Sequence, residues 1–402
     1  MTLQTVFVVD AVRSPIGKFK GALSSVRSDD LAAHVVSALV KRQPVACQRL
    51  EQVVFGATNQ AGEDNRNVAR MAALLAGLPF EVPAVTVNRL CGSGLEAIND
   101  AARMIALGEV DVAIGGGVES MTRAPYSMPK PEEAFPRTPP TLYDTTLGWR
   151  YPNPRMKQRF ELIGMGETAE NVAKKHGITR DEQDQFALSS HQKAAAAWEK
   201  NAFAGEIAPL EIPQKKGAPV VFDRDECVRP DSSLAALSKL LPAFREGGSV
   251  TAGNSSPLND GSAAVLLASE ALVRELGLTP VARWAGSATA GVDPSYMGEG
   301  PIPATKNLLA RVGLRAPNID VVELNEAFAA QSLACLRGLD LDPARVNVRG
   351  GAIALGHPIG ASGARIVATL LGVMKDDAKA KVGLASLCIG VGQGIATLFE
   401  RV

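Results

Sequence analysis

Three reactive side chains lie in glycine-rich segments that are far apart in this chain of 402 residues. Cys91 begins the run Cys-Gly-Ser-Gly, His357 lies in Gly-His-Pro-Ile-Gly, and Cys388 begins Cys-Ile-Gly-Val-Gly. A thiol becomes a strong nucleophile when a neighbouring base takes its proton, and an imidazole often acts as that base. Glycines let backbone amides approach a ligand because they carry no side chain. Together the three segments predict acyl transfer through a thioester.

Cys91 and His357 each precede a predicted helix. A helix N-terminus supplies free N–H groups and a positive potential, which favour the thiolate form of Cys91. The same potential disfavours an imidazolium, so His357 is expected to be neutral and able to accept a proton. The alternative for Cys91 is a buried structural cysteine, since free cysteines are often buried. Gly92 and Gly94, which leave room for a thioester, favour the nucleophile.

Other polar groups are predicted at the ends of neighbouring strands. Gly390 and the glycines after it follow Cys388, and such a loop can aim backbone N–H groups at a developing oxyanion. Asn325 and Glu326 follow an apolar strand and supply an amide and a carboxylate. Ligands of open α/β sheets bind at strand ends, so these groups are expected near the reactive residues.

The segment 92–97, Gly-Ser-Gly-Leu-Glu-Ala, also matches a loose dinucleotide-binding fingerprint. That fingerprint needs an acidic residue at the end of the next strand, where this chain has three glycines, 115–117. The pattern therefore does not favour a nicotinamide cofactor. His34, His176 and His191 are expected on the faces of helices, outside the site.

The same order of elements is predicted twice, once at each end of the chain. In the N-terminal part, strands are expected at 6–10, 52–56, 83–87 and 110–115, and helices at 29–41, 67–75 and 92–107. In the C-terminal part, strands are expected at 319–324, 345–348 and 382–387, and helices at 326–336 and 360–374. Both parts place glycines before a helix that leads into an apolar strand. An internal duplication of a βαβ-type half is the prediction.

The middle of the chain has a different texture. Residues 121–154 are rich in proline, which predicts an irregular excursion. Helices are expected at 168–175 and 180–200, the second capped by Thr179. A long insertion on a duplicated core is a natural place for a lobe that covers the substrate.

Composition excludes several classes of protein. The 42 basic and 42 acidic residues cancel, whereas a nucleic-acid-binding protein needs an excess of Lys and Arg. The apolar runs are shorter than a membrane span, and no signal-peptide pattern is present. Five cysteines without a Cys-x-x-Cys pair argue against a disulfide framework and a zinc site. A cytoplasmic location is expected.

Taken in order, these segments resemble the thiolase family, the acetyl-CoA C-acyltransferases. The resemblance begins at Val9 and extends to the C-terminus. Its blocks are Asn88-Arg-Leu-Cys-Gly-Ser-Gly, Gly117-Val-Glu-Ser-Met, Thr251-Ala-Gly-Asn, Leu258-Asn-Asp-Gly, Asn325-Glu-Ala-Phe, 351–363 and Cys388-Ile-Gly.

The resemblance implies an α/β fold of the thiolase type, with five layers αβαβα built from two duplicated halves and an inserted loop domain. The N-terminal half is expected at 1–118 plus 249–275, the loop domain, which would bind CoA, at 119–248, and the C-terminal half at 276–402. A homodimer or homotetramer is also implied. CoA and its thioesters would be substrates, with no further cofactor and no metal.

Roles for individual residues are implied in the same way. Cys91 resembles the acylated nucleophile, His357 the group that activates it, and Cys388 the group that moves a proton at the α-carbon. Asn325, through a water, and His357 resemble one oxyanion site, and the amides of Cys91 and Gly390 resemble the other. Contacts to the substrate or to CoA are implied for Met165, Arg229, Phe244, Ser256, Met297 and Phe328.

The substrate follows from where the chain departs from the family. Gly164 stands where the short-chain biosynthetic branch has a histidine, and 61–70 and 143–150 resemble the degradative 3-oxoadipyl-CoA thiolases. The family's Gly-Asn-Ala-Ser-Gly reads Gly-Asn-Ser-Ser-Pro at 253–257. We expect cleavage, by free CoA, of a 3-oxoacyl-CoA larger than acetoacetyl-CoA into acetyl-CoA and a shortened acyl-CoA. For a substrate with a terminal carboxylate, Arg150 and Arg159 are the candidate partners.

Three alternatives stay open. One is a biosynthetic enzyme that forms acetoacetyl-CoA. Another is a non-catalytic acyl-CoA or lipid carrier of the same fold, which the full set of Cys91, His357 and Cys388 disfavours. The third is a decarboxylating ketoacyl synthase, which typically has a second histidine where this chain has Asn325.

Overall fold

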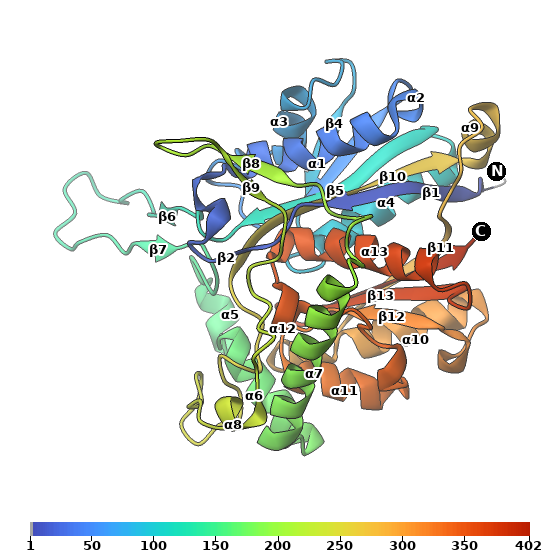
Figure 1. Ribbon diagram of the computed structural model, residues 1–402. Helices are drawn as coiled ribbons and strands as arrows, with labels where there is room; N and C mark the ends of the chain where they lie inside the picture. The colour runs from blue at the N-terminus through green and yellow to red at the C-terminus, as the bar shows by residue number, and fades with distance from the viewer. Residues whose placement is uncertain (1–2) are drawn as a thin grey trace.

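The computed structural model describes residues 3–402, and its strands form one continuous mixed sheet (Figure 1). Within these residues ten strands are joined, in the order β12-β13-β14-β11-β1-β10-β5-β3-β4, with β2 beside β10. The N-terminal strands are β1 (Val6–Arg13), β2 (Gly17–Lys18), β3 (Gln52–Gly56), β4 (Ala84–Val87), β5 (Val112–Ser120) and β10 (Asn259–Ser269). The C-terminal strands are β11 (Ala282–Gly291), β12 (Val321–Leu324), β13 (Val382–Ile389) and β14 (Gln393–Arg401).

The sheet consists of two halves with the same topology. The N-terminal half has the order β4-β3-β5-β10-β1, and the C-terminal half has β12-β13-β14-β11. In each half two neighbouring strands are parallel, β3 with β5 and β12 with β13, and the remaining pairs toward the centre are antiparallel. Only two residue pairs join β1 to β11, Phe7 with Arg283 and Val8 with Ala282. The predicted duplication is confirmed.

Helices complete the five predicted layers. Figure 1 shows α4 (Ser93–Leu107) and α13 (Ile359–Asp376) between the two halves, with α1 (Ser28–Arg42) and α3 (Val68–Leu75) above them. On the opposite side, α10 (Pro301–Val312) and α11 (Ala329–Leu339) cover the C-terminal strands. Three separate apolar cores lie between these layers. Most residues of α13 are buried, as expected for a helix that both halves of the sheet cover.

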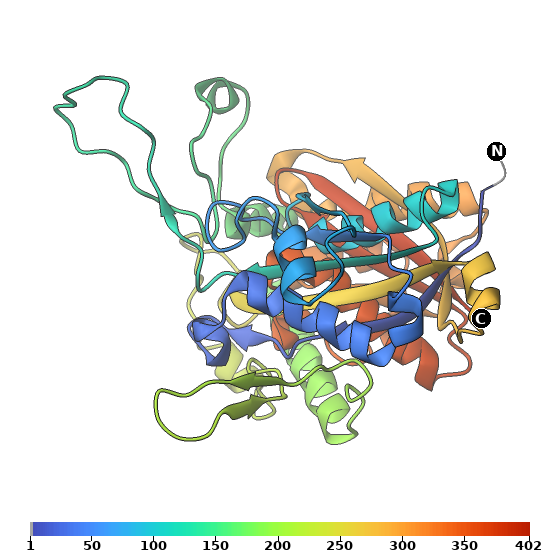
Figure 2. The ribbon, with the colours of Figure 1, turned by 90° about the horizontal axis from the view of Figure 1, so that it is seen from above.

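The inserted segment lies at the end of the molecule away from the chain termini and combines irregular structure and short elements with two longer helices (Figure 1). The proline-rich residues contain two strands of two residues, and Figure 2 shows the teal loop between them projecting beyond the layers. Thr179 caps its helix as predicted, and it forms a capping box with Glu182. The elements are β6 (Tyr126–Ser127), β7 (Tyr143–Asp144), α5 (Pro154–Arg159), α6 (Met165–His176), α7 (Arg180–Glu199), β8 (Leu210–Ile212), β9 (Val220–Phe222) and α8 (Leu234–Leu237).

The remaining helices are short. They are α2 (Pro44–Cys47), α9 (Glu270–Glu275) and α12 (Ala352–Leu355), together with four 3-10 turns, Ala22–Ser25, Pro294–Glu299, Ala316–Asn318 and Pro343–Arg345. Within residues 3–402, no helix has the length and apolar character needed to cross a membrane. His34, His176 and His191 lie on α1, α6 and α7, as predicted.

Strand β5 is longer than predicted, because the glycines 115–117 continue it instead of ending it. A side chain on Gly115 or Gly117 would collide with the central helices, and one on Gly116 would collide with the neighbouring strands. A Cβ on Gly115 would lie 2.6 Å from the Cα of Ile98, and one on Gly117 would lie 2.2 Å from the carbonyl oxygen of Gly360. The glycines therefore allow α4 and α13 to approach the sheet closely.

The predicted strand at 345–348 is wrong. This segment lies where β4 lies in the other half, but it makes only one bridge, between Val346 and Val322. Asn347 has a φ of 47°, and its side chain takes over the pairing. The Asn347 amide accepts from Leu324 N at 2.9 Å and donates to Leu324 O at 2.8 Å. Helix α11 likewise begins at Ala329 and not at Glu326, since Phe328 is extended and bridges Ser255.

Candidate active site

Cys91 lies in a tight turn between β4 and α4. The turn places Leu90 at a φ of 47°, and the Asn88 side chain accepts from Leu90 N at 2.9 Å. The Ser93 hydroxyl donates to Leu90 O at 2.6 Å, which closes the turn from the helix side. A Cβ on Gly92 would lie 2.7 Å from a methyl carbon of Ile389, so the turn touches the end of β13.

Cys91 and Cys388, the two cysteines predicted to react, are neighbours in the structure. Burial raises the pKa of the Cys91 thiol to about 11, against the backbone N–H groups of Gly390 and of Cys91 itself, which favour the thiolate. The Cys388 thiol is buried, and burial together with the nearby Cys91 raises its pKa well above the usual value. Cys91 is partly exposed, but the atoms around its thiol exclude enough water for desolvation to set the direction of the pKa shift. Burial therefore outweighs the N–H groups that were expected to favour the thiolate.

His357 lies between α12 and α13, and its ring is fixed at the Nδ1 side. Nδ1 is 2.6 Å from the Ser362 hydroxyl, which itself donates to Pro358 O at 3.0 Å. The hydroxyl has one proton, so it accepts from Nδ1–H and leaves Nε2 as the basic nitrogen. Burial, and then the charge of Arg365, lowers the pKa of His357 to about 3. The neutral imidazole agrees with the prediction.

Asn325 lies beside the imidazole, as predicted. Its side-chain nitrogen is 3.4 Å from His357 Nδ1 and 3.5 Å from Nε2. Its side-chain oxygen is buried and has no hydrogen-bond partner among the described residues. Asn259, which the sequence reasoning did not single out, accepts from His357 N at 2.9 Å and holds the backbone of this loop.

The first turns of α4 and α13 are in contact, which brings the thiol and imidazole segments together. A Cβ on Gly94 would lie 2.9 Å from Gly360 O, and one on Gly363 would lie 2.2 Å from Leu95 N. Cys91 and His357 each precede one of these turns by two residues. Glycine at Gly94 and Gly363 is thus required by the close approach of the two helices.

Glu119 ties this contact to β3 and was not predicted as a site residue. One carboxylate oxygen accepts from Gly360 N at 2.9 Å and from Thr58 N at 3.0 Å. Burial raises the pKa of Glu119 to about 7. In the sequence, Glu119 could have been found from the polar end of an otherwise apolar strand. Ser362 and Asn259 were marked only by lying in segments that resemble the thiolase family.

Four of the predicted substrate-contacting residues gather around the second cysteine. Met165, Met297 and Phe328 share one apolar cluster with Cys388. Phe244 meets Phe328 edge to face, with ring centroids 6.1 Å apart and an interplanar angle of 85°. A Cβ on Gly166 would lie 2.1 Å from the Phe244 ring, so α6 and this ring are in contact.

The last two predicted contacts, Ser256 and Arg229, lie further out. Ser256 is half-buried and donates its N–H to Ala327 O at 3.0 Å. Arg229 is exposed and donates its backbone N–H to His191 on α7 at 3.2 Å. Asn259 donates to Cys227 Sγ at 3.2 Å, which places the segment before Arg229 beside the His357 loop.

Glu326, expected near the reactive groups, is a brace. Its carboxylate accepts from Ser190 on α7 at 2.7 Å, from Asn347 at 2.8 Å and from Ile353 N at 3.1 Å. Burial raises its pKa. Glu326 therefore fixes the loop that leads to His357 against the inserted lobe.

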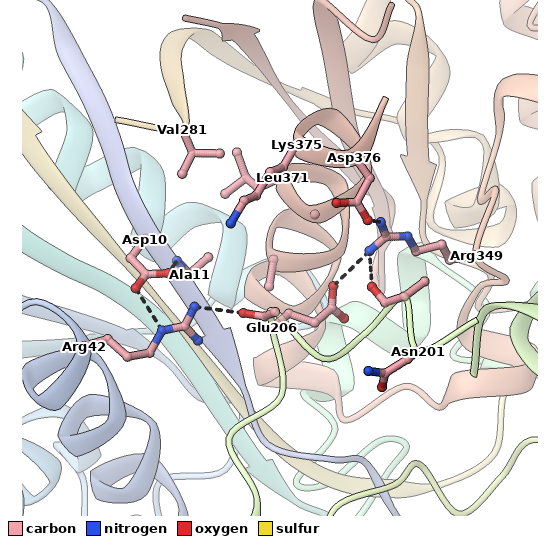
Figure 3. Close-up of a pocket in the computed structure, with 14 residues that line it drawn as sticks. Asp10, Ala11, Arg42, Asn201, Glu206, Val281, Arg349, Leu371, Lys375 and Asp376 are labelled. Carbon is pink, nitrogen blue, oxygen red and sulfur yellow. Dashed lines mark hydrogen bonds and ion pairs between the residues drawn. The ribbon is translucent and has the colours of Figure 1, made fainter. Parts of the chain in front are cut away.

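The cavity in Figure 3 is separate from this site. It has a volume of about 200 Å³ and is lined by the C-terminal end of α13 together with Asp10, Arg42, Glu206 and Arg349. Most of its charges are mutually paired, as in Arg42 with Asp10 at 3.0 Å and Arg349 with Asp376 at 2.6 Å. His357 precedes the opposite end of α13. All five cysteines are free, and within residues 3–402 no group of three or more His, Cys, Asp or Glu side chains could hold a metal.

Residues 6–271 match the family model "Thiolase, N-terminal domain", and residues 278–401 match "Thiolase, C-terminal domain". The chain belongs to the thiolase family. The β-ketoadipyl-CoA thiolase of Acinetobacter baylyi is 55% identical over 399 residues, which cover 98% of this chain and 99% of that protein. This thiolase is accordingly an acyltransferase that acts on 3-oxoacyl-CoA thioesters.

Solved structures agree with this assignment. The acetyl-CoA acetyltransferase of Bacillus anthracis is 43% identical with a TM-score of 0.93, and the match covers 100% of both chains. Human mitochondrial 3-ketoacyl-CoA thiolase in complex with CoA is 40% identical with a TM-score of 0.92, and the match covers 99% of this chain and 98% of that one. The predicted thiolase fold is confirmed.

Proposed function

We propose that this thiolase cleaves 3-oxoadipyl-CoA with free CoA and releases acetyl-CoA and succinyl-CoA. The observation that carries the proposal is the 55% identity, over nearly the whole of both chains, to a β-ketoadipyl-CoA thiolase. The resemblance of 61–70 and 143–150 to 3-oxoadipyl-CoA thiolases points the same way.

Cys91 is the proposed nucleophile of the first half-reaction. Its sulfur attacks C3 of the substrate, and its proton passes to Nε2 of His357, the nitrogen that Ser362 leaves free. The bond between C2 and C3 then breaks. The resulting carbanion at C2 takes the proton of Cys388, which gives acetyl-CoA and leaves a succinyl thioester on Cys91.

The second half-reaction reverses these proton transfers. The thiol of CoA gives its proton to the Cys388 thiolate, and the CoA sulfur attacks the succinyl thioester. Cys91 leaves and recovers its proton from the His357 imidazolium, so that the enzyme returns to its starting state. The raised pKa of both thiols and the lowered pKa of the imidazole support neutral groups at rest.

Two sets of donors are proposed to stabilise oxyanions. The N–H groups of Cys91 and Gly390 already favour negative charge on the Cys91 sulfur, so they are placed for a thioester oxygen bonded nearby. The amide of Asn325, beside His357, serves the other oxygen with the help of a water. CoA itself is proposed to lie along Phe244, Ser256 and Arg229.

Formation of acetoacetyl-CoA remains the second candidate, favoured by the 43% identity to an acetyl-CoA acetyltransferase. Position 164 weighs against it. Gly164 caps α6 directly before Met165, and its N–H is held by Glu167 at 2.9 Å. Without an imidazole there, the site has more room for a longer acyl chain.

We also propose that two copies associate through β4, the unpaired edge of the N-terminal half. Among residues 3–402, strand β4 pairs with β3 on one side only. Val85 on this strand is 38% exposed, and Leu74, Leu75 and Phe80 nearby are more exposed still. An unpaired apolar edge strand is a template on which another chain can pair. Free thiols fit the reducing cytoplasm, which is the proposed location.

The substrate proposal is tested by kcat/KM on acetoacetyl-, 3-oxohexanoyl-, 3-oxodecanoyl- and 3-oxoadipyl-CoA under one set of conditions. We expect the highest value for 3-oxoadipyl-CoA, by about tenfold or more over acetoacetyl-CoA. A tenfold preference for acetoacetyl-CoA would favour the second candidate and remove the argument from Gly164.

A further inference from the structure

The proposed substrate differs from other 3-oxoacyl thioesters of the same length by its terminal carboxylate. In the acyl-enzyme this carboxylate is separated from the thioester carbon by two methylene groups. A side chain that recognises it must therefore lie close to Cys91. A carboxylate taken out of water also needs strong donors, and a guanidinium that forms two parallel hydrogen bonds is the best suited.

Arg150 is held on the Cys91 side of the inserted lobe. Its Nη1 donates to Thr145 O at 2.9 Å, and its Nη2 lies 3.5 Å from Thr58 O. The same Thr58 oxygen accepts from the side chain of Asn88 at 3.1 Å. Asn88 in turn holds the turn that carries Cys91, so the guanidinium and the Cys91 turn meet at one carbonyl group.

The loop that carries Arg150 is held by contacts of the residues on either side of it. Trp149 donates its indole N–H to Ile163 O at 3.1 Å, two residues before Met165. Tyr151 has a φ of 50°, and its ring lies 4.6 Å from that of Tyr143. The loop thus connects the Thr58 side of the site to the start of α6.

Met165, at the start of α6, lies close to Gly390 in the Cys388 loop. Its sulfur lies 3.4 Å, and a methyl carbon of Leu90 3.3 Å, from the place where a Cβ on Gly390 would stand. Gly390 supplies the N–H that faces the Cys91 sulfur. Leu90 and Met165 therefore lie beside the residue whose N–H faces the Cys91 sulfur, and Arg150 lies on the loop that contacts the start of α6.

Arg150 has no acidic partner. Within residues 3–402 no carboxylate lies within 4.0 Å of its guanidinium, whereas most half-buried arginines of this chain are paired, as Arg103 and Arg123 are. Two of its five N–H donors are used by carbonyl groups, which leaves three. A half-buried cation with free donors and no counter-ion favours an anionic ligand.

We propose that Arg150 binds the terminal carboxylate of the acyl chain and so determines the preference for a dicarboxylic substrate. The inference rests on the proposed cleavage of 3-oxoadipyl-CoA. Arg159, the other candidate from the sequence, is exposed at the end of α5, and its guanidinium lies 5.7 Å from the ring of Phe160. It is too far into solvent to desolvate a carboxylate.

The test compares 3-oxoadipyl-CoA with 3-oxohexanoyl-CoA, which has the same number of carbons but ends in a methyl group. In Arg150→Met we expect kcat/KM for 3-oxoadipyl-CoA to fall about 100-fold, chiefly through KM. The value for 3-oxohexanoyl-CoA should stay within about threefold of the wild type. Arg159→Met is the matched control and should change neither value.

The outcomes separate this inference from the function on which it rests. If the wild type shows no preference for 3-oxoadipyl-CoA, the proposed function fails. If the wild type prefers it and Arg150→Met keeps the preference, the role of Arg150 is overturned. Equal losses on both substrates would make Arg150 only a brace of its loop. Should the methionine variant fold poorly in a thermal melt, Arg150→Lys decides: it keeps the charge but not the paired donors, and about a tenfold loss confined to 3-oxoadipyl-CoA is expected.

Discussion

The two halves of this thiolase share a topology but differ at their outer edges. The N-terminal half ends in a regular strand, β4, whose outer side is unpaired within residues 3–402. The corresponding segment of the C-terminal half makes one bridge, at Val346, and is covered by α7. Lys193 on that helix donates to Val346 O at 2.9 Å, and Ser190 accepts from Gly351 N at 3.0 Å.

The difference shows how a duplicated frame can divide its tasks. Cys91 follows the open edge after a short turn, so a partner subunit at β4 would lie close to the nucleophile. His357 follows the covered edge. Glu326 binds both α7 and the segment between that edge and His357, and so fixes this segment against α7. One edge is thus the one we propose for assembly, and the other is covered by elements that hold the base in place.

Removing either half's reactive group should have the largest effect. Cys91→Ala and His357→Ala should each lower kcat by about 10⁴-fold or more, since the thiol and the imidazole act as one unit. The double variant should be no slower than the slower single variant. Single-turnover kinetics with 3-oxoadipyl-CoA measure these rates. Losses that multiply in the double variant would show that the thiol and the imidazole act independently.

A charge on the open edge should break assembly and leave the covered edge intact. Val85→Lys places an ammonium on the 38% exposed face of β4, and we expect monomers in size-exclusion chromatography with light scattering. Val221→Lys, on the 55% exposed face of β9, is the matched control and should keep the assembly of the wild type. An unchanged oligomer in Val85→Lys would show that another surface joins the subunits.

The smallest effect is expected in the pH profile of Cys91 alkylation, which distinguishes a neutral thiol and imidazole from a thiolate–imidazolium pair. The Cys91 thiol, with its pKa raised to about 11, should react with iodoacetamide faster by about tenfold per pH unit from pH 7 to 10. The pKa of His357, lowered to about 3, adds no step between pH 5 and 8. Peptide mapping follows the alkylation of Cys91, and His357→Ala should keep the slope. A plateau below pH 8 would indicate a thiolate–imidazolium pair instead.

Much of this arrangement was predictable, because its signals are local. The βαβ order is visible in short apolar runs, and Cys91, His357 and Cys388 are marked by the glycines beside them. Glycine next to a reactive residue indicates a close approach of backbone, and the contact of Gly94 with Gly360 provides one.

The features that sequence missed depend on distant partners. The failed strand at 345–348 requires the Asn347 side chain to replace backbone pairing with β12, which no local pattern records. The raised pKa of Cys91 arises from burial, which outweighs the N–H groups of Gly390 and of Cys91 itself. Ser362 and Asn259 matter because of where His357 lies, and Glu119 because of where Gly360 lies.

The central claim is that the acyl group is carried by Cys91 while Cys388 moves a proton. It is tested most directly by intact-protein and peptide mass spectrometry of the Cys388→Ser enzyme. Succinyl-CoA should still give an adduct of one succinyl group on the peptide that contains Cys91, because the CoA thiolate is a far better leaving group than a C2 carbanion and can leave without the proton of Cys388. Turnover of 3-oxoadipyl-CoA, which needs that proton at C2, should be severely slowed. An adduct on another residue of this variant, or none at all, would contradict the account, as would wild-type turnover without Cys91.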